Sequence, residues 1–142
     1  MTRLSIDVTP DDLIDTLSFF DSWEDRYRYI IDLGKMLVEQ DASFRTDERL
    51  VRGCQSQVWM DCEPDGDQLY VIVDSDAHIV KGLLYVVLVA YHGKTPTEIL
   101  AWDMEGFFTQ LDLIKHLSPT RGNGLRAMVK RIQHCAQAAL VG

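Results

Sequence analysis

Along the first 37 residues, apolar positions recur at the three- and four-residue spacing of a helix. Thr9 stands before a proline and two aspartates, which is typical of a helix N-terminus. Ser22 is a second candidate N-cap, because Asp25 follows it at the capping-box distance and a further apolar stripe begins there. The pattern therefore predicts two helices, within residues 8–20 and 21–37, that form a hairpin and cover a sheet.

The middle of the chain changes to the pattern of a loop followed by strands. Residues 39–53 are polar and aperiodic, and this predicts a loop. The segments 56–63 and 67–75 are rich in β-branched and aromatic residues and flank the turn sequence Pro-Asp-Gly-Asp, so they predict an antiparallel hairpin. Because side chains alternate along a strand, Trp59 and Cys62 are expected on opposite faces of the first strand.

The C-terminal half is predicted to be helical. Residues 76–91 form an apolar run that is too long for one strand and is followed by a glycine, so they are interpreted as a buried helix. Thr95 and the proline after it begin a short helix, and further helices are expected within 104–117 and 125–140. The intervening residues 118–124, Ser-Pro-Thr-Arg-Gly-Asn-Gly, are interpreted as a turn.

The order of these elements predicts a fold class and one domain. N-terminal helices, a small antiparallel sheet and C-terminal helices are typical of an α+β domain, here over residues 1–142. The net charge is −8 and no lysine- or arginine-rich run occurs, so neither nucleic acid nor a membrane surface is an expected partner. The N-terminus lacks the apolar core of a signal peptide, and residues 79–91 are too short to span a bilayer. A cytoplasmic location is therefore expected.

The chain contains three cysteines. An odd number without a secretion signal argues against a disulfide framework and predicts reduced thiols. Cys135 falls on the inward stripe of the last predicted helix and Cys62 lies in the middle of a strand, so both are interpreted as core residues. Cys54 instead ends a loop, where reactive groups are common, and its position alone leaves open whether it packs or reacts.

Other site chemistries find little support in the sequence. No Cys-x-x-Cys pair occurs, and the spacing from Cys54 to Cys62 matches no zinc signature. The chain also has no Gly-x-Ser-x-Gly motif and no phosphate-binding glycine loop.

Several segments together resemble one protein family. Gly-Cys-Gln-Ser-Gln-Val-Trp-Met (53–60), the block 74–88 that starts Asp-Ser-Asp-Ala, and the block 117–132 resemble successive parts of the SufE family. The tryptophan-led segment 23–37 is similar to a helix of the same family. The resemblance runs from about Trp23 to Ile132 and is closer to the SufE branch than to the CsdE branch.

The resemblance implies a sulfur-acceptor protein with the fold of the IscU/NifU scaffold proteins. The family cysteine falls on Cys54, which is expected to take sulfane sulfur from a SufS/CsdA-type cysteine desulfurase as a persulfide and pass it to a SufBCD-type iron–sulfur scaffold. No cofactor of its own is expected, because the pyridoxal phosphate belongs to the desulfurase. The protein is expected to act as an accessory to that enzyme rather than as an enzyme, and as a monomer or weak homodimer. An apolar wall including Val58 or Trp59 is expected to shield Cys54 until docking presents it.

Residues next to the cysteine receive supporting roles from the same resemblance. Gly53 allows unusual backbone angles beside Cys54, and Gln55 and Gln57 supply uncharged hydrogen bonds or ordinary turn chemistry. The block that starts at position 74 departs from the family at His78, where a small residue is usual, so no base role is given to that histidine.

Three charged residues further along the chain are also candidates. Asp74 and Asp76 match a loop expected beside the cysteine loop, although at least one of them is expected to cap the following helix. Arg121 matches the family arginine in the turn before the last helix, where it stabilises a thiolate, contacts the desulfurase or is simply exposed. The turn sequence Arg-Gly-Asn-Gly itself differs from the usual one.

Two rival functions remain open. One is a metal- or cluster-binding scaffold that uses Cys54 with Cys62 or histidines, and the other is a purely structural adaptor.

Overall fold

The N-terminal helices begin at the caps that the sequence predicts. The structure is a computed structural model and describes residues 4–141. Helix α1 (Pro10–Ser18) starts with a reciprocal capping box between Thr9 and Asp12, and α2 (Trp23–Gly34) starts at Ser22. Helix α2 ends earlier than position 37, and Met36 beyond it is exposed.

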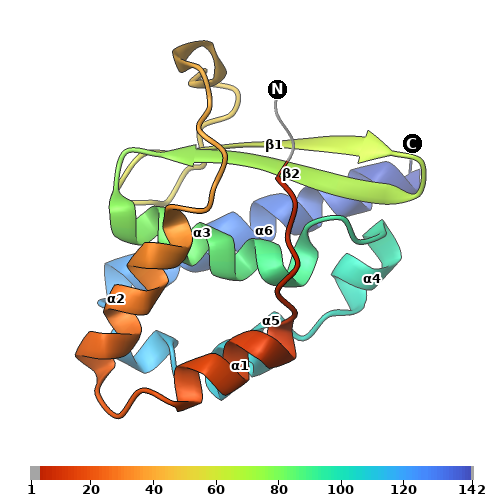
Figure 1. Ribbon diagram of the computed structural model, residues 1–142. Helices are drawn as coiled ribbons and strands as arrows, with labels where there is room; N and C mark the ends of the chain where they lie inside the picture. The colour runs from red at the N-terminus through yellow and green to blue at the C-terminus, as the bar shows by residue number, and fades with distance from the viewer. Residues whose placement is uncertain (1–3, 142) are drawn as a thin grey trace.

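Two antiparallel strands form the sheet, as predicted. Strand β1 (Val58–Asp65) pairs with β2 (Gln68–Ser75) across a turn in which Gly66 adopts φ 61°. Figure 1 shows this hairpin lying across α3 and α6, with the segment that precedes β1 on its other side. Cys62 packs against the main core on the helix side, whereas Trp59 packs in a separate cluster on the other face. The predicted alternation is therefore confirmed.

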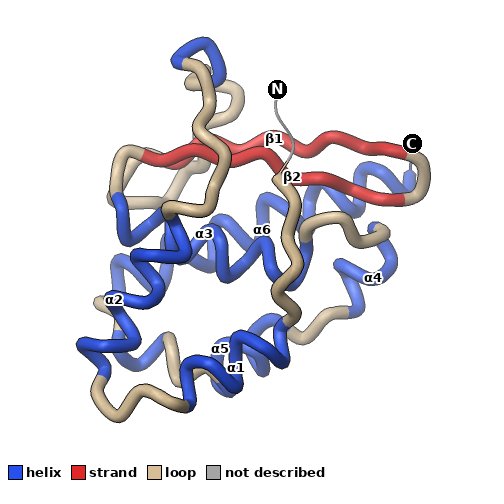
Figure 2. The backbone as a smooth tube through the Cα atoms, viewed as in Figure 1, coloured by secondary structure: helices blue, strands red, loops and turns tan. Residues whose placement is uncertain are grey.

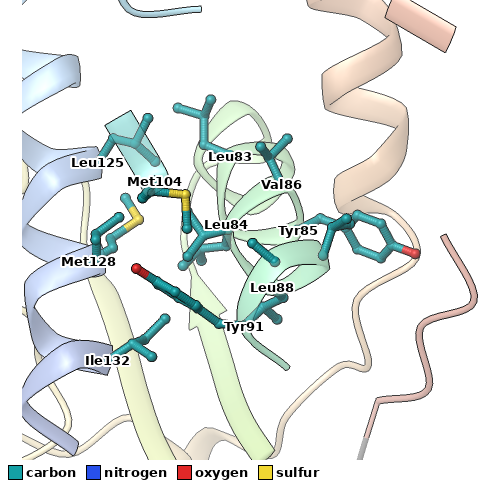
Figure 3. Packing of buried hydrophobic residues seen from close by; sticks show 14 of the residues in the cluster. Leu83, Leu84, Tyr85, Val86, Leu88, Tyr91, Met104, Leu125, Met128 and Ile132 are labelled. Atoms are coloured by element: carbon teal, nitrogen blue, oxygen red, sulfur yellow. The ribbon is translucent and has the colours of Figure 1, made fainter. Parts of the chain in front are cut away.

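The centre of the molecule is a helix buried on nearly all sides. Helix α3 (His78–Tyr91) has every residue from 82 to 91 buried. Figure 3 shows Tyr91 of α3 beside Met128 and Ile132 of α6. Each large apolar side chain buried in this way contributes about 1.5–3 kcal/mol to folding. The interpretation of this run as a buried helix is confirmed.

The C-terminal helices differ from the prediction in two places. Helix α4 (Pro96–Ala101) starts at the predicted Thr95 cap, but residues 104–117 divide into α5 (Met104–Gln110) and the short 3-10 helix η2 (Ile114–His116). The break falls at Asp112, whose φ of 57° cannot continue a helix.

The last helix, α6 (Pro119–Val141), begins earlier than predicted. The interpretation of 118–124 as a turn is wrong, because the Ser118 Oγ accepts a hydrogen bond from the Arg121 N–H and Pro119 takes the first helical position. The two glycines in this segment, Gly122 and Gly124, are helical and buried. Figure 2 places α6 alongside the hairpin in an α+β arrangement of a two-stranded sheet and helices.

A disulfide joins Cys62 of β1 to Cys135 of α6, with Cα atoms 6.5 Å apart. The prediction that all cysteines are reduced is therefore wrong for this structure. The pair lies 73 residues apart in the chain, and nothing in the local sequence of either cysteine indicates the other. Among residues 4–141, no helix is both long enough and apolar enough to cross a bilayer.

Candidate functional site

The candidate site is a short loop, residues 52–57, closed at its base by backbone pairing. The Val51 N–H donates to the Val58 carbonyl oxygen at 2.8 Å, so the chain enters and leaves the loop at one point. Inside the loop, Gly53 adopts φ 93°, a conformation that side chains other than glycine's rarely adopt. The expected backbone freedom of Gly53 is thus used directly beside Cys54.

The Cys54 thiol faces the N-terminal half of α6. Its Sγ–H donates to the Gly124 carbonyl oxygen at 3.5 Å, and the side chain is half-buried. A methyl group built on Gly124 would lie 3.5 Å from both the Cα and the Sγ of Cys54, which is ordinary contact distance, so Gly124 lies directly against the cysteine. Burial raises the pKa of the Cys54 thiol above its ordinary value. The raised pKa disfavours the thiolate, which is the nucleophilic form of cysteine.

Of the two residues expected in the wall beside the loop, Trp59 is not part of it. Trp59 lies on the outer face of the sheet, under the guanidinium of Arg45 at 4.5 Å from the ring centre, in a cluster separate from Cys54. Val58 is fully buried in the main core, and Cys54 packs against that core. The loop also contacts α6, where Gly124 lies against Cys54 and Ala127 lies beside Gly53.

The far end of the loop is held by the last residue of β2 and the residue after it. The Gln57 N–H donates to the Asp76 Oδ1 at 3.1 Å, and the Gln57 carbonyl oxygen accepts from the Ser75 Oγ at 2.7 Å. Asp76 therefore lies beside the cysteine loop, as the resemblance implied. The side chains of Gln55 and Gln57 make no hydrogen bond to any residue between 4 and 141, so Gln57 takes part through its backbone.

Neither aspartate caps α3, and that part of the prediction is wrong. The N-cap of α3 is Ala77, which has no side-chain cap, and its N–H donates to the Ser75 Oγ at 3.3 Å. Asp74 is buried, and its Oδ2 accepts from the Arg45 Nε at 2.8 Å. Asp74 thus fastens the segment before the cysteine loop to the sheet.

One face of α6 carries the residues that hold this whole segment. We call it the α6 stripe, and it consists of Gly124, Ala127, Arg131 and Cys135, spaced three and four residues apart. Arg131 donates to the carbonyl oxygens of Glu48 at 2.7 Å and of Leu50 at 3.3 Å. The stripe therefore contacts the loop at its tip and the chain at its entry.

Arg121 lies in the first turn of α6, not in a turn before it. It is one helical turn before Gly124, so it continues the face of the α6 stripe toward the N-terminus. Within the described part of the chain, its side chain makes no hydrogen bond or ion pair.

The sequence analysis did not identify Gly124, Ala127 or Arg131 as part of the site. The local signal that could have led to Gly124 is the helix start at Ser118 and Pro119, because a helix that begins there includes this glycine. Nothing in the local sequence marks Arg131, because its partners lie about 80 residues earlier.

A metal site finds no support in the side-chain arrangement. Over residues 4–141, no group of three or more histidine, cysteine, aspartate or glutamate side chains is placed to hold a metal ion. Cys62, the nearest candidate co-ligand in sequence, is bonded to Cys135.

Comparison with known proteins shows which family this chain matches. The family model "SufE: Fe-S metabolism associated domain" matches residues 11–136. An uncharacterised SufE-like protein of Rhizobium etli is 49% identical over 131 residues, covering 89% of this chain and 88% of that protein. A second, from Rhizobium meliloti, is 46% identical over 134 residues, covering 92% and 96%.

The fold also has a counterpart among solved structures. The solution structure of a hypothetical protein from Thermus thermophilus superposes with a TM-score of 0.73 at 20% identity, covering 95% of this chain and all of the other. At this identity the likeness concerns the fold alone.

Proposed function

This chain belongs to the SufE family, which is associated with iron–sulfur metabolism, and from that premise we propose that it carries sulfane sulfur on Cys54. The donor is a cysteine desulfurase of the SufS/CsdA type and the acceptor is a scaffold of the SufBCD type. The observation that carries the proposal is the position of Cys54, the one free thiol among residues 4–141, at the tip of a loop pinned at both ends.

The transfer is a thiol exchange that needs only one cysteine of this chain. The Cys54 thiolate attacks the outer sulfur of the donor's persulfide, a new S–S bond forms at Cys54, and the donor's cysteine leaves as a thiolate. The second transfer repeats this exchange toward the scaffold. The protein requires no cofactor for either step, since the pyridoxal phosphate that releases sulfur from cysteine belongs to the donor. The protein therefore acts as an accessory that removes the persulfide sulfur from the desulfurase.

The resting geometry suits a carrier that is shielded between encounters. Against Gly124 the thiol is half-buried and its pKa is raised, which disfavours the thiolate and slows its reaction with stray oxidants and thiols. Docking must draw the loop away from α6, and the fixed points at Val58 and Asp76 limit that movement to residues 52–57. Once in water, the thiol loses the burial that raised its pKa and becomes a better nucleophile.

A sulfur-loading experiment tests the proposal. The full chain is incubated with a SufS-type desulfurase, pyridoxal phosphate and cysteine, and peptides are then mapped by mass spectrometry under non-reducing conditions. We expect one added sulfur atom on Cys54 and none in the Cys54→Ser variant. Absence of added sulfur on Cys54 in the presence of an active donor contradicts the proposal.

The same samples separate the two rival functions. A structural adaptor predicts that Cys54→Ser stimulates the desulfurase as well as the wild type does. A cluster-binding scaffold predicts a stoichiometric metal in the purified protein that Cys54→Ser loses. The carrier predicts loss of stimulation in Cys54→Ser and no metal that depends on Cys54.

A further inference from the structure

The second sulfur site of the molecule is the Cys62–Cys135 pair. Both cysteines are partly exposed at the edge of the main core, and neither is fully buried. Their Cα separation of 6.5 Å is within the range that a disulfide spans without backbone movement. Forming or opening this bond therefore requires no movement of the backbone.

The pair joins the same two elements that hold Cys54. Strand β1 begins directly after the cysteine loop, and Cys62 is four residues into it. Cys135 is the last member of the α6 stripe, whose first member, Gly124, lies against Cys54. Between them Arg131 holds the loop's entry segment through the Glu48 and Leu50 carbonyls. One helix face thus contacts the hairpin and its preceding segment at successive turns, and the covalent bond is at the last of them.

From this arrangement we propose that Cys62 and Cys135 are a redox-active pair whose oxidation fastens α6 to the hairpin and slows the release of Cys54 from Gly124. The inference rests on the proposed function, because release of Cys54 is what sulfur acceptance requires. In the dithiol state α6 separates from β1 more readily, and the contact between the Cys54 thiol and Gly124 therefore breaks more often.

The oxidation is a thiol–disulfide exchange with a low-molecular-weight disulfide such as oxidised glutathione. One cysteine thiolate attacks the reagent, forms a mixed disulfide and releases one glutathione thiolate. The second cysteine thiolate attacks the mixed disulfide, forms the Cys62–Cys135 bond and releases the second glutathione. The two protein sulfurs are oxidised, the two glutathione sulfurs are reduced, and the protons of the two thiols pass to the released glutathione.

The test compares the two redox states of the full wild-type chain. One sample is reduced with a phosphine, and the other is oxidised with oxidised glutathione and accepted only if its mass shows one internal disulfide and no adduct. The rate of Cys54 alkylation by iodoacetamide is then followed from the Cys54 peptide at early times. We expect Cys54 to react about fivefold or more faster in the reduced sample, the lower end of usual coupling between sites.

The matched control removes the pair and leaves Cys54 in place. In Cys62→Ser/Cys135→Ser the alkylation rate is expected to be the same in both buffers and close to that of the reduced wild type. If the serine variant folds poorly, Cys62→Ala/Cys135→Ala is used as the control in its place. Equal rates for oxidised and reduced wild type, a redox effect that persists in these variants, or failure of the pair to oxidise overturns the inference.

The two proposals fail separately in this design. Alkylation reports release of Cys54 whether or not sulfur transfer occurs. If a desulfurase loads no sulfur on Cys54 in either state, the proposed function fails, while the alkylation ratio still decides the redox coupling. If sulfur loading and Cys54 alkylation each proceed at the same rate in the oxidised and the reduced protein, the redox coupling is wrong and the proposed function stands.

Discussion

The Cys54 thiol donates to the carbonyl oxygen of Gly124, which lies 70 residues further along the chain, across a distance of 3.5 Å. Glycine inside a helix costs about 1 kcal/mol relative to alanine. A methyl group at position 124 would still lie at ordinary contact distance, 3.5 Å from the Cys54 Sγ, so only a side chain longer than that of alanine would displace the thiol.

Enlarging residue 124 is expected to expel the thiol. Gly124→Leu places atoms where Cys54 now lies, so the loop moves outward and iodoacetamide alkylation of Cys54 accelerates about tenfold, which corresponds to about 1.4 kcal/mol. Gly124→Ala fits at ordinary contact distance and is expected to stabilise the fold by about 0.5–1 kcal/mol without speeding alkylation.

Gly122→Ala is the control for helix propensity in that experiment. A methyl group there would meet only the Ile114 Cγ2 at 4.0 Å, so it changes the helix and leaves Cys54 untouched. An unchanged alkylation rate in Gly124→Leu would show that Gly124 does not control the seat of the thiol.

The pH midpoint of Cys54 alkylation is expected to be higher in the folded protein than in the unfolded chain. Burial raises the pKa of this thiol in the folded protein, so the pH midpoint of alkylation should lie above the value of about 8.5 expected for an unfolded chain. With the Cys62–Cys135 disulfide intact only Cys54 reacts, so pH–rate profiles of the native and urea-unfolded protein measure both midpoints.

The same shift has a consequence for stability. The folded state keeps the Cys54 proton to higher pH than the unfolded state does. The contribution of this thiol to the free energy of unfolding is therefore complete below its unfolded-state pKa and is lost as pH rises through its folded-state pKa. Cys54→Ala is expected to lose less stability than the wild type over that alkaline interval. A native midpoint at or below the unfolded one would contradict both statements.

Arg131 is expected to anchor the entry to the cysteine loop. Arg131→Met removes the hydrogen bonds to the Glu48 and Leu50 carbonyls, and we expect a loss of about 1–2 kcal/mol in urea unfolding. Amide hydrogen exchange should increase over residues 46–52. Lys130→Met, an exposed change on the same helix, should cost less than about 0.5 kcal/mol and leave exchange there as it was.

Two ion pairs of different burial are expected to contribute differently to the free energy of unfolding. Arg45→Gln leaves the Asp74 carboxylate, 8% exposed, without its guanidinium partner, and should destabilise the protein by about 2 kcal/mol. Arg126→Gln breaks a pair with Glu105 whose side chains are largely exposed, and should cost less than about 1 kcal/mol.

The exposed pair gives a spectroscopic check. The hydrogen bond from Arg126 lowers the pKa of Glu105, so Arg126→Gln should raise that pKa in an NMR titration. Equal losses of stability in Arg45→Gln and Arg126→Gln would show that Asp74 does not depend on its pairing.

Reduction of the disulfide is expected to lower stability. Closing a loop between cysteines 73 residues apart restricts the unfolded chain, and its loss should cost about 4 kcal/mol. Urea unfolding with and without a phosphine measures the difference. Cys62→Ser/Cys135→Ser should match the reduced wild type and show no effect of reductant; a wild type indifferent to reductant would refute the estimate.

Local signals predicted most of the secondary structure. The caps at Thr9, Ser22 and Thr95 rest on side chains that bond within three residues, so the sequence shows both partners at once. The start of α6 was missed because Ser118, Pro119 and two glycines have the composition of a turn. The local signal for a helix start was nevertheless present, because Ser118 accepts from the Arg121 N–H and Pro119 takes the first helical position.

The sequence by itself determined the α+β order of elements, the family and the choice of Cys54 as the candidate site, because these depend on residues close together in the chain or on a contiguous motif. The tertiary structure decided where Cys54 points, that Gly124 and Arg131 hold its loop, and that Cys62 meets Cys135. These contacts join residues 70 to 83 positions apart, and only the packing of α6 against the hairpin brings them within reach.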